Sequence, residues 1–333
     1  MRGDGNKAEA RAGSARVLSF WYTYNERMWA MIIKEREEPF ELKILRLLNP
    51  RMTLPDKQHF SNLEKGYEGE LQLDVWLEDL KNESLIVNDL LLKHKQQLFQ
   101  IDTLLIFSNK IYLFNVKYYE GDYYTEHDKW YVMSGKEIND PLLQLKRSDY
   151  LLRQLFQSLK MNFLPVEPLL IFIHPAFMLY NASHHLPAVF PSQLQRYMNK
   201  LNREPSKINR KHEHLAERLA TLHEEKPPHT DLPDYDFDQL EKGVVCAKCS
   251  KIVFFTAETF GFRCGSCGHE ETFKTGLLRS IEEFKMLFPE KKITTPAIIE
   301  WCALKGDKKK VSRILGTHYK RVGSGRYTHF IDG

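Results

Sequence analysis

Two apolar runs separated by a short polar turn constrain the fold of this chain more than any other feature. Residues 100–107 and 111–117 have the length and the aliphatic and aromatic content of strands, and Ser108-Asn109-Lys110 separates them. This pattern predicts two adjacent antiparallel strands that are largely buried. Polar side chains inside such a hairpin cost free energy unless they are paired with each other or serve chemistry.

Three polar side chains are predicted to share one face at the open end of this hairpin. If the turn is centred on Asn109 and Lys110, Asp102 faces Lys117 across the strands. The two-residue alternation of a strand then puts Asn115 on the same face as Lys117. Asp102 and Asn115 would be diagonal neighbours, roughly 7 Å apart at Cβ, close enough to bind one ion. The alternative is a purely structural ion pair between Asp102 and Lys117.

The segments around the hairpin resemble a known family. In chain order they are Gly66-Tyr67-Glu68-Gly69-Glu70, Gln100-Ile101-Asp102, Asn115-Val116-Lys117 and Pro141-Leu142-Leu143-Gln144. They resemble the nuclease-related domain family, NERD, of the PD-(D/E)xK nuclease superfamily, whose pattern runs Gly-x-x-Gly-Glu, Gln-Ile-Asp, Glu-x-Lys and Pro-x-x-Gln. The resemblance covers about residues 66–175, and the matching site residues are Glu70, Asp102, Lys117 and Gln144. Asn115 departs from it, because the family has Glu there.

The resemblance implies a restriction-endonuclease-like α/β fold, with a mixed sheet flanked by helices, and phosphodiester hydrolysis assisted by Mg²⁺ or Mn²⁺. Glu70, Asp102 and Asn115 would then bind the metal. Because Mg²⁺ prefers charged oxygen ligands, Asn115 is expected to weaken its binding. Glu68 or Glu120 would supply a third carboxylate if the fold brings either one near.

The two remaining matches would act on the substrate. Lys117 would stabilise the negative charge that develops at the phosphate or orient the attacking water, and Gln144 would position water or phosphate from a helix. Two functions stay open at this point. One is a divalent-metal-dependent nuclease acting on nucleic acid, with DNA as the expected substrate. The other is a non-catalytic nucleic-acid-binding protein whose nuclease site is degenerate at Asn115.

Four of the five cysteines have the spacing of a zinc ribbon. Cys246-Ala247-Lys248-Cys249 and Cys264-Gly265-Ser266-Cys267 are separated by 14 residues, and residues 252–255 and 261–262 between them resemble short strands. Four thiolates close a tetrahedral zinc site and leave no position for catalysis, so the zinc is expected to be structural. Redox disulfides are the competing interpretation, which a reducing cytosol disfavours.

The C-terminus concentrates positive charge. Residues 301–333 hold eight Lys or Arg and two Asp, a net charge of +6, whereas the rest of the chain sums to −2. Helices are expected at 277–288, 295–304 and 308–315 and a hairpin at 319–330, a small basic winged-helix-like module. We expect it to bind phosphates rather than bases, through Lys308, Lys309, Lys310, Arg313, Lys320, Arg321 and Arg326. The alternative is a solvated basic face without a partner.

These features predict a division of the chain. Residues 1–30 are expected to be a disordered tail or to precede a true start at Met28 or Met31. The expected units that follow are a helical arm at 31–60, the nuclease-like domain at 61–205, a charged helix and linker at 206–241, the zinc ribbon at 242–275 and the basic module at 276–333. No apolar run reaches about 18 residues and no signal peptide is evident, so we expect a cytoplasmic protein that does not bind membranes.

Overall fold

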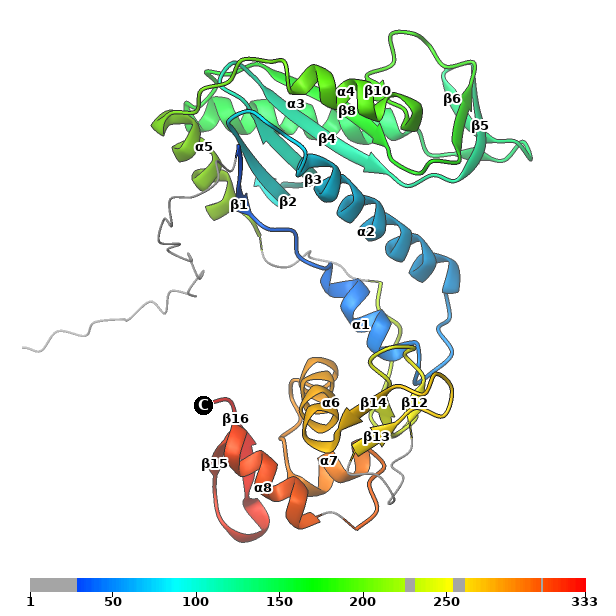
Figure 1. Cartoon of the computed structure of the whole chain (residues 1–333), viewed down its shortest axis with the longest axis vertical. Helices are drawn as coiled ribbons and strands as arrows, with labels where there is room; N and C mark the ends of the chain where they lie inside the picture. The colour runs from blue at the N-terminus through cyan, green and yellow to red at the C-terminus, as the bar shows by residue number, and fades with distance from the viewer. Residues whose placement is uncertain (1–28, 225–230, 254–260, 307) are drawn as a thin grey trace, which may run out of the picture.

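A computed structural model describes residues 29–224, 231–253, 261–306 and 308–333 of the chain, in two lobes joined by α1 (Phe40–Leu48) and its flanking segments (Figure 1). Residues 1–28 of the tail expected at 1–30, part of the expected linker, and Phe254 and Phe255 of an expected strand lie outside these described residues. A bilayer-spanning helix is not found in the described ranges, since none of their helices joins the necessary length to the necessary apolar content.

The first lobe is built on a six-stranded mixed sheet. Its strands, in spatial order, are β1 (Ala30–Lys34), β2 (Ser84–His94), β3 (Gln97–Ile106), β4 (Ile111–Lys117), β8 (Val166–Phe172) and β10 (Ala188–Val189). β2, β3 and β4 pair antiparallel, whereas β1 with β2, β4 with β8 and β8 with β10 pair parallel. The central strands are apolar on both faces, as expected for a sheet that is covered on both sides.

Helices cover both faces of this sheet. On one face, α2 (Lys57–Leu77) and α4 (Leu194–Leu201) bury apolar side chains against alternate residues of β3 and β4. On the other face, α3 (Pro141–Leu159) and α5 (Arg210–Thr221) do the same. Asp140 caps α3 by accepting a hydrogen bond from the Leu142 N–H (2.8 Å), and Pro141 follows at the first helical position. This architecture confirms the predicted mixed sheet flanked by helices.

Three features of this lobe differ from the expectation. The expected helical arm begins with a strand, β1, because alternate residues of 30–34 add a parallel edge strand to β2. A second sheet was not predicted, with the order β7 (Glu137–Ile138), β6 (Lys129–Val132), β5 (Gly121–Glu126) and β9 (Phe177–Tyr180). The charged helix expected in the linker, α5, packs on the main sheet through Leu215, Ala216 and Leu219.

The second lobe has one apolar core shared by three segments. Two short hairpins carry the cysteine pairs: β11 (Val244–Val245) with β12 (Ile252–Val253), and β13 (Gly261–Arg263) with β14 (Glu270–Thr272). Their residues pack with α1 from the start of the described chain and with the C-terminal helices. The buried Arg51 joins these parts, since its guanidinium bonds to Glu283 (2.9 Å) and lies 3.8 Å from the centroid of the Trp301 ring.

The C-terminal segment has the order of a winged helix. Its elements are α6 (Phe273–Leu287), α7 (Thr295–Trp301), α8 (Lys308–His318), β15 (Lys320–Val322), the short 3-10 helix η2 (Gly325–Tyr327) and β16 (His329–Ile331). The other short 3-10 helix, η1 (Pro191–Gln193), precedes α4 in the first lobe. Between α6 and α7, Ile293 forms an antiparallel bridge to Phe330 of β16. Three helices are thus followed by a hairpin, and one strand of this hairpin bridges to the segment between the first two helices. This order matches the winged-helix-like expectation.

Candidate functional site

The site predicted on the hairpin lies where β3 and β4 separate. The last paired residues are Thr103 and Phe114, and beyond them the Val116 N–H donates to the Asp102 carboxylate (2.7 Å) instead of to a backbone carbonyl. The Asp102 side chain therefore occupies the space between the two strands. We call this point the strand fork. It is the place where side chains from both faces of the sheet can meet.

The predicted register of the hairpin was wrong by two residues. Leu104 pairs with Leu113 and not with Asn115, and Asn115 lies opposite Asp102. The cause is the turn, because the Phe107 N–H donates to the Lys110 carbonyl (2.9 Å) and only Ser108 and Asn109 lie between them. A shift of two residues preserves the face of every side chain, so Asp102 and Asn115 still come together.

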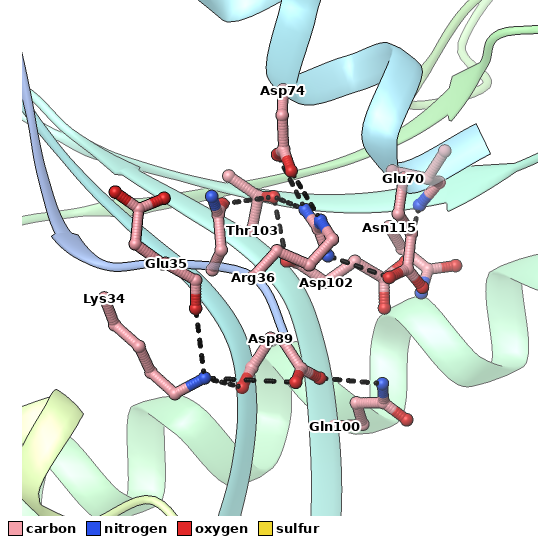
Figure 2. Close-up of polar contacts among 12 residues, drawn as sticks. Lys34, Glu35, Arg36, Glu70, Asp74, Asp89, Gln100, Asp102, Thr103 and Asn115 are labelled. Atoms are coloured by element: carbon pink, nitrogen blue, oxygen red, sulfur yellow. Dashed lines mark hydrogen bonds and ion pairs between the residues drawn. The ribbon is translucent and has the colours of Figure 1, made fainter. Parts of the chain in front are cut away.

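An acidic residue from α2 reaches the fork. Gly69 lets the helix approach β4, since a Cβ at this position would lie 2.9 Å from the Tyr118 Cβ. Figure 2 shows the heads of Glu70, Asp102 and Asn115 converging there. Burial and the charge of Asp102 raise the pKa of Glu70 to about 8, although Arg36 opposes the shift.

Arg36 is the main residue of the site that sequence reasoning missed. It lies between β1 and α1, its side chain is 2% exposed, and it donates to Asp74 through two nitrogens (2.7 and 2.9 Å) and to Glu70 (2.8 Å) and Thr103 (2.8 Å) (Figure 2). In the sequence it stands in the run Glu35-Arg36-Glu37-Glu38, which looks like a solvated charged segment. Only long-range contacts distinguish it from its neighbours.

Asp89 was missed as well. The pairs that flank it in the β2–β3 ladder put it opposite Asp102, and its φ of 47° is in the left-handed region, uncommon for a residue within a strand. Its carbonyl accepts from Lys34 (2.9 Å), and its carboxylate accepts from Gln100 (3.4 Å) (Figure 2). Its negative charge contributes to the raised pKa of Asp102, for which burial is the main cause.

The lysine and the glutamine of the predicted site contact each other. Lys117 Nζ donates to Gln144 Oε1 of α3 (2.7 Å). Among the ion pairs of the described residues none joins Lys117 to Asp102, so the structural ion pair considered as an alternative is not formed. Burial lowers the pKa of Lys117, while the charges of Asp102 and Glu70 oppose this shift. The Lys117 side chain thus lies near two carboxyl groups, and its hydrogen bond to the Gln144 amide fixes its direction.

One oxygen of the fork is left without a partner. Asn115 Nδ2 donates to Asp102 Oδ2 (3.1 Å), but Asn115 Oδ1 is buried and has no hydrogen-bond partner among the described residues. A buried acceptor in this state costs about 1–3 kcal/mol. An oxygen beside two carboxyl groups suits a hard divalent cation, so Asp102, Asn115 and Glu70 fit such a metal, with the positive charge of Arg36 acting against it.

Neither Glu68 nor Glu120, the two candidates for a third carboxylate ligand, supplies one at the fork. Glu68 accepts from the Tyr118 hydroxyl (3.0 Å), and the exposed Glu120 pairs with Lys65 (3.0 Å). Within the described ranges, the one group of three or more Cys, His, Asp or Glu residues with ligand atoms close enough for a metal is the cysteine cluster. The fork therefore has two carboxylates and one amide.

A comparison with protein families agrees with this geometry. The family model of the nuclease-related domain matches residues 65–173. The chain contains a NERD domain. The match spans Glu70, Asp102, Asn115, Lys117 and Gln144 but not Arg36, and it ends before α4 and the cysteines. The search of curated proteins and that of solved structures found no match.

Outside the NERD domain, the four cysteines form one compact cluster. The Sγ atoms of Cys246, Cys249, Cys264 and Cys267 all lie within 4.8 Å of one another, with Cys246 to Cys267 at 3.7 Å and Cys249 to Cys264 at 3.5 Å. Tetrahedral bonding at about 2.3 Å requires sulfur atoms about 3.8 Å apart. The cluster therefore fits the zinc ribbon predicted from the spacing.

The basic residues of the C-terminal module lie mainly on its surface. Lys308, Lys309 and Arg313 are exposed on α8, and Lys320 and Arg321 are exposed on β15. The ammonium of Lys310 lies 3.8 Å from the centroid of the Phe273 ring, and the side chain of Arg326 lies outside the described part of the structure. A hollow of about 400 Å³ between α8 and the start of α6 is lined by Lys274, Lys310, Arg313 and His318 among others.

Proposed function

We propose that this protein is a divalent-metal-dependent nuclease that hydrolyses phosphodiester bonds in DNA. The observation that carries the proposal is the strand fork, where a buried and a partly buried carboxyl group, an unpartnered amide oxygen and a lysine meet within a NERD domain. Asp102, Asn115 and Glu70 would hold Mg²⁺ or Mn²⁺. Bound there, the metal would polarise the phosphate and lower the pKa of a water molecule.

In this proposal the side chains of the chain itself have separate roles. Lys117, positioned by Gln144, would stabilise negative charge on the phosphate oxygens in the transition state. The hydrogen bonds from Val116 and Asn115 hold Asp102 in place, so its carboxylate would present a metal ligand in a fixed position. The zinc ribbon would be structural, since its four sulfurs leave no open ligand position.

The exposed cations of α8 and β15 would bind the DNA backbone, as expected for a basic winged-helix-like module. Some residues of this module belong to the core of the lobe, among them Trp301, Val311 and Phe330, so only exposed residues are suitable for substitution. Lys308→Gln, Lys309→Gln and Arg313→Gln on the exposed side of α8 remove charge without removing core residues.

A second function is favoured by a specific observation. Arg36 pairs with Glu70 as well as with Asp74, and Asn115 supplies no charge, so the fork has less net negative charge than a site with three carboxylates. Such a site suits a protein that binds nucleic acid without cutting it. In that case the nuclease-like fold would serve as a platform for binding.

A cleavage assay separates the two functions. The full-length protein is incubated with labelled DNA, with and without Mg²⁺ or Mn²⁺, beside the variants Asp102→Ala and Lys117→Ala. A nuclease gives metal-dependent fragments that disappear in Asp102→Ala, while Lys117→Ala lowers turnover more than binding. If the wild type and the variants all leave single- and double-stranded DNA and RNA intact, the binding function takes the place of the nuclease.

A further inference from the structure

A basic surface outside the matched NERD segment lies on α4 and the turns that flank it. Its residues point to the outside of the first lobe and line a shallow hollow of about 500 Å³. They are Ser192, Gln195, Arg196, Asn199, Lys200 and Arg203, all exposed. We call this surface the α4 face. The sequence pattern did not predict a functional role for any of these residues.

The charge of the α4 face is not balanced by neighbours. Three of its residues are cations, the other three are amides and a hydroxyl, and no carboxylate lines the hollow. No ion pair of the described residues includes Arg196, Lys200 or Arg203, whereas Arg36 at the strand fork and Arg51 and Arg279 in the second lobe are paired with carboxylates. Three neighbouring cations without an acidic partner attract a polyanion.

The spacing of these cations suits an extended ligand. Arg196 and Lys200 are four residues apart on one side of α4, about 6 Å along its axis, and Arg203 lies in the turn that follows the helix. Amides and a hydroxyl between them add neutral hydrogen-bond donors for phosphate oxygens. A repeating anion such as a phosphodiester backbone can contact several of these groups at once.

The apolar side of α4 excludes a lipid surface as the partner. A membrane-binding amphipathic helix inserts its apolar side between lipids, but Met198 and Leu201 are 2% and 0% exposed in the core under the sheet. The Tyr197 ring is also unavailable to lipid, since it stacks on the Trp76 ring at a centroid distance of 6.3 Å. Only the polar side is available, and it is fixed in position by the core.

The contact between Tyr197 of α4 and Trp76 of α2 relates the α4 face to the strand fork. Trp76 and Glu70 are both on α2, six residues apart, which is about 9 Å along the helix. α2 and α4 cover the same face of the sheet. A DNA duplex adds about 3.4 Å per base pair, so the roughly 9 Å between Trp76 and Glu70 along α2 corresponds to about three base pairs.

We propose that the α4 face binds the phosphodiester backbone of duplex DNA and holds the substrate across the NERD domain. The proposal rests on the proposed function for the identity of the polyanion, but it concerns binding and not cleavage. It adds a contact surface on the first lobe to the basic module of the second. No base recognition is implied, because the cations of this face act on phosphates.

The test compares two triple variants of the full-length protein that lose the same charge. One carries Arg196→Gln, Lys200→Gln and Arg203→Gln. The control carries Lys93→Gln, Lys146→Gln and Lys211→Gln, three exposed lysines on β2, α3 and α5. Binding of a labelled DNA duplex is measured over a series of salt concentrations without added divalent metal, so cleavage does not enter the result.

The α4 variant is expected to bind about tenfold or more weakly at low salt, and the slope of log K against log salt is expected to fall by up to about 2.7, at about 0.9 per lost phosphate contact. The control is expected to change affinity by about twofold or less. Equal affinity and slope for the two variants, or no DNA binding by the wild type, overturns the proposal. Loss of binding to phosphatidylserine vesicles but not to DNA also overturns it. DNA binding through the α4 face without any metal-dependent cleavage supports the proposal while rejecting the proposed nuclease function.

Discussion

The cysteine cluster and the strand fork bring candidate metal ligands together in opposite ways. The cluster takes four ligands of one kind from residues 246–267, and its two halves have the same shape. In each half the fifth residue from the first cysteine, Ser250 or Gly268, has a positive φ and donates its N–H to the carbonyl of that cysteine. The fork takes a glutamate, an aspartate and an asparagine from α2, β3 and β4.

The charges at the two sites differ as well. No cationic side chain is among the ligands of the cluster, and its sulfur atoms are already close to the spacing that zinc requires. At the fork, Arg36 and Lys117 lie among the acidic groups and offset their charge. A metal in the cluster would therefore be a permanent part of the fold, whereas a metal at the fork would compete with the cations of the protein.

The largest expected effect is the loss of the cluster. Cys249→Ser should release about one zinc per chain and unfold the second lobe, because zinc binding in such sites contributes about 10–16 kcal/mol to folding. Cys302→Ala is the control, since this buried cysteine belongs to the same core but not to the cluster. Elemental analysis and thermal unfolding are the measurements. Reductively purified wild type without zinc would contradict the structural role of the cluster.

The next effect concerns the cation that already lies at the fork. Arg36→Met leaves Glu70 and Asp74 without their buried partner, so the free energy of unfolding should fall by about 3–5 kcal/mol. Arg46→Met is the matched control, because the more exposed Arg46 also pairs with two carboxylates, those of Glu38 and Glu64. Its substitution should lower the free energy of unfolding by about 1 kcal/mol or less.

Denaturant unfolding measures the difference between these two arginine variants. Added Mg²⁺ should raise the melting temperature of Arg36→Met more than that of the wild type, since the freed carboxylates can bind a cation. Equal stability losses in Arg36→Met and Arg46→Met would show that the pairing of Arg36 is no stronger than a surface ion pair.

The features that the sequence predicted well have local causes. The cysteine spacing and the strand character of the hairpin each depend on residues that are close together in the chain. The shared face of Asp102 and Asn115 also followed from alternation alone. It was insensitive to the register error, because the error was an even number of residues.

The features that the sequence did not predict depend on distant contacts. Arg36 is defined by Glu70, Asp74 and Thr103, which lie 34 to 67 residues away. The helix α1 resembles part of an arm, yet it packs into a core with residues beyond 237. The α4 face is visible only once Met198 and Leu201 are known to be buried, since without them the helix is one more charged segment.

The smallest expected effect tests whether the fork binds a metal at all. Asn115→Asp replaces the amide that donates to Asp102 by a second carboxylate, and two adjacent carboxylates repel and raise each other's pKa. Without metal the variant should therefore melt at a lower temperature than the wild type. With Mg²⁺ the difference should shrink, and half-maximal cleavage should need severalfold less metal, because a charged oxygen has joined the ligands.

The matched control for this substitution is Asn109→Asp, which adds the same charge at the exposed turn of the same hairpin. It should respond to Mg²⁺ as the wild type does. The measurements belong above pH 8, since burial raises the pKa of Glu70 to about 8 and a proton on that carboxyl group competes with the metal. If Mg²⁺ leaves the stability of Asn115→Asp as low as before, the fork is not a metal site, and its carboxyl groups serve the fold through Arg36 and Val116 instead.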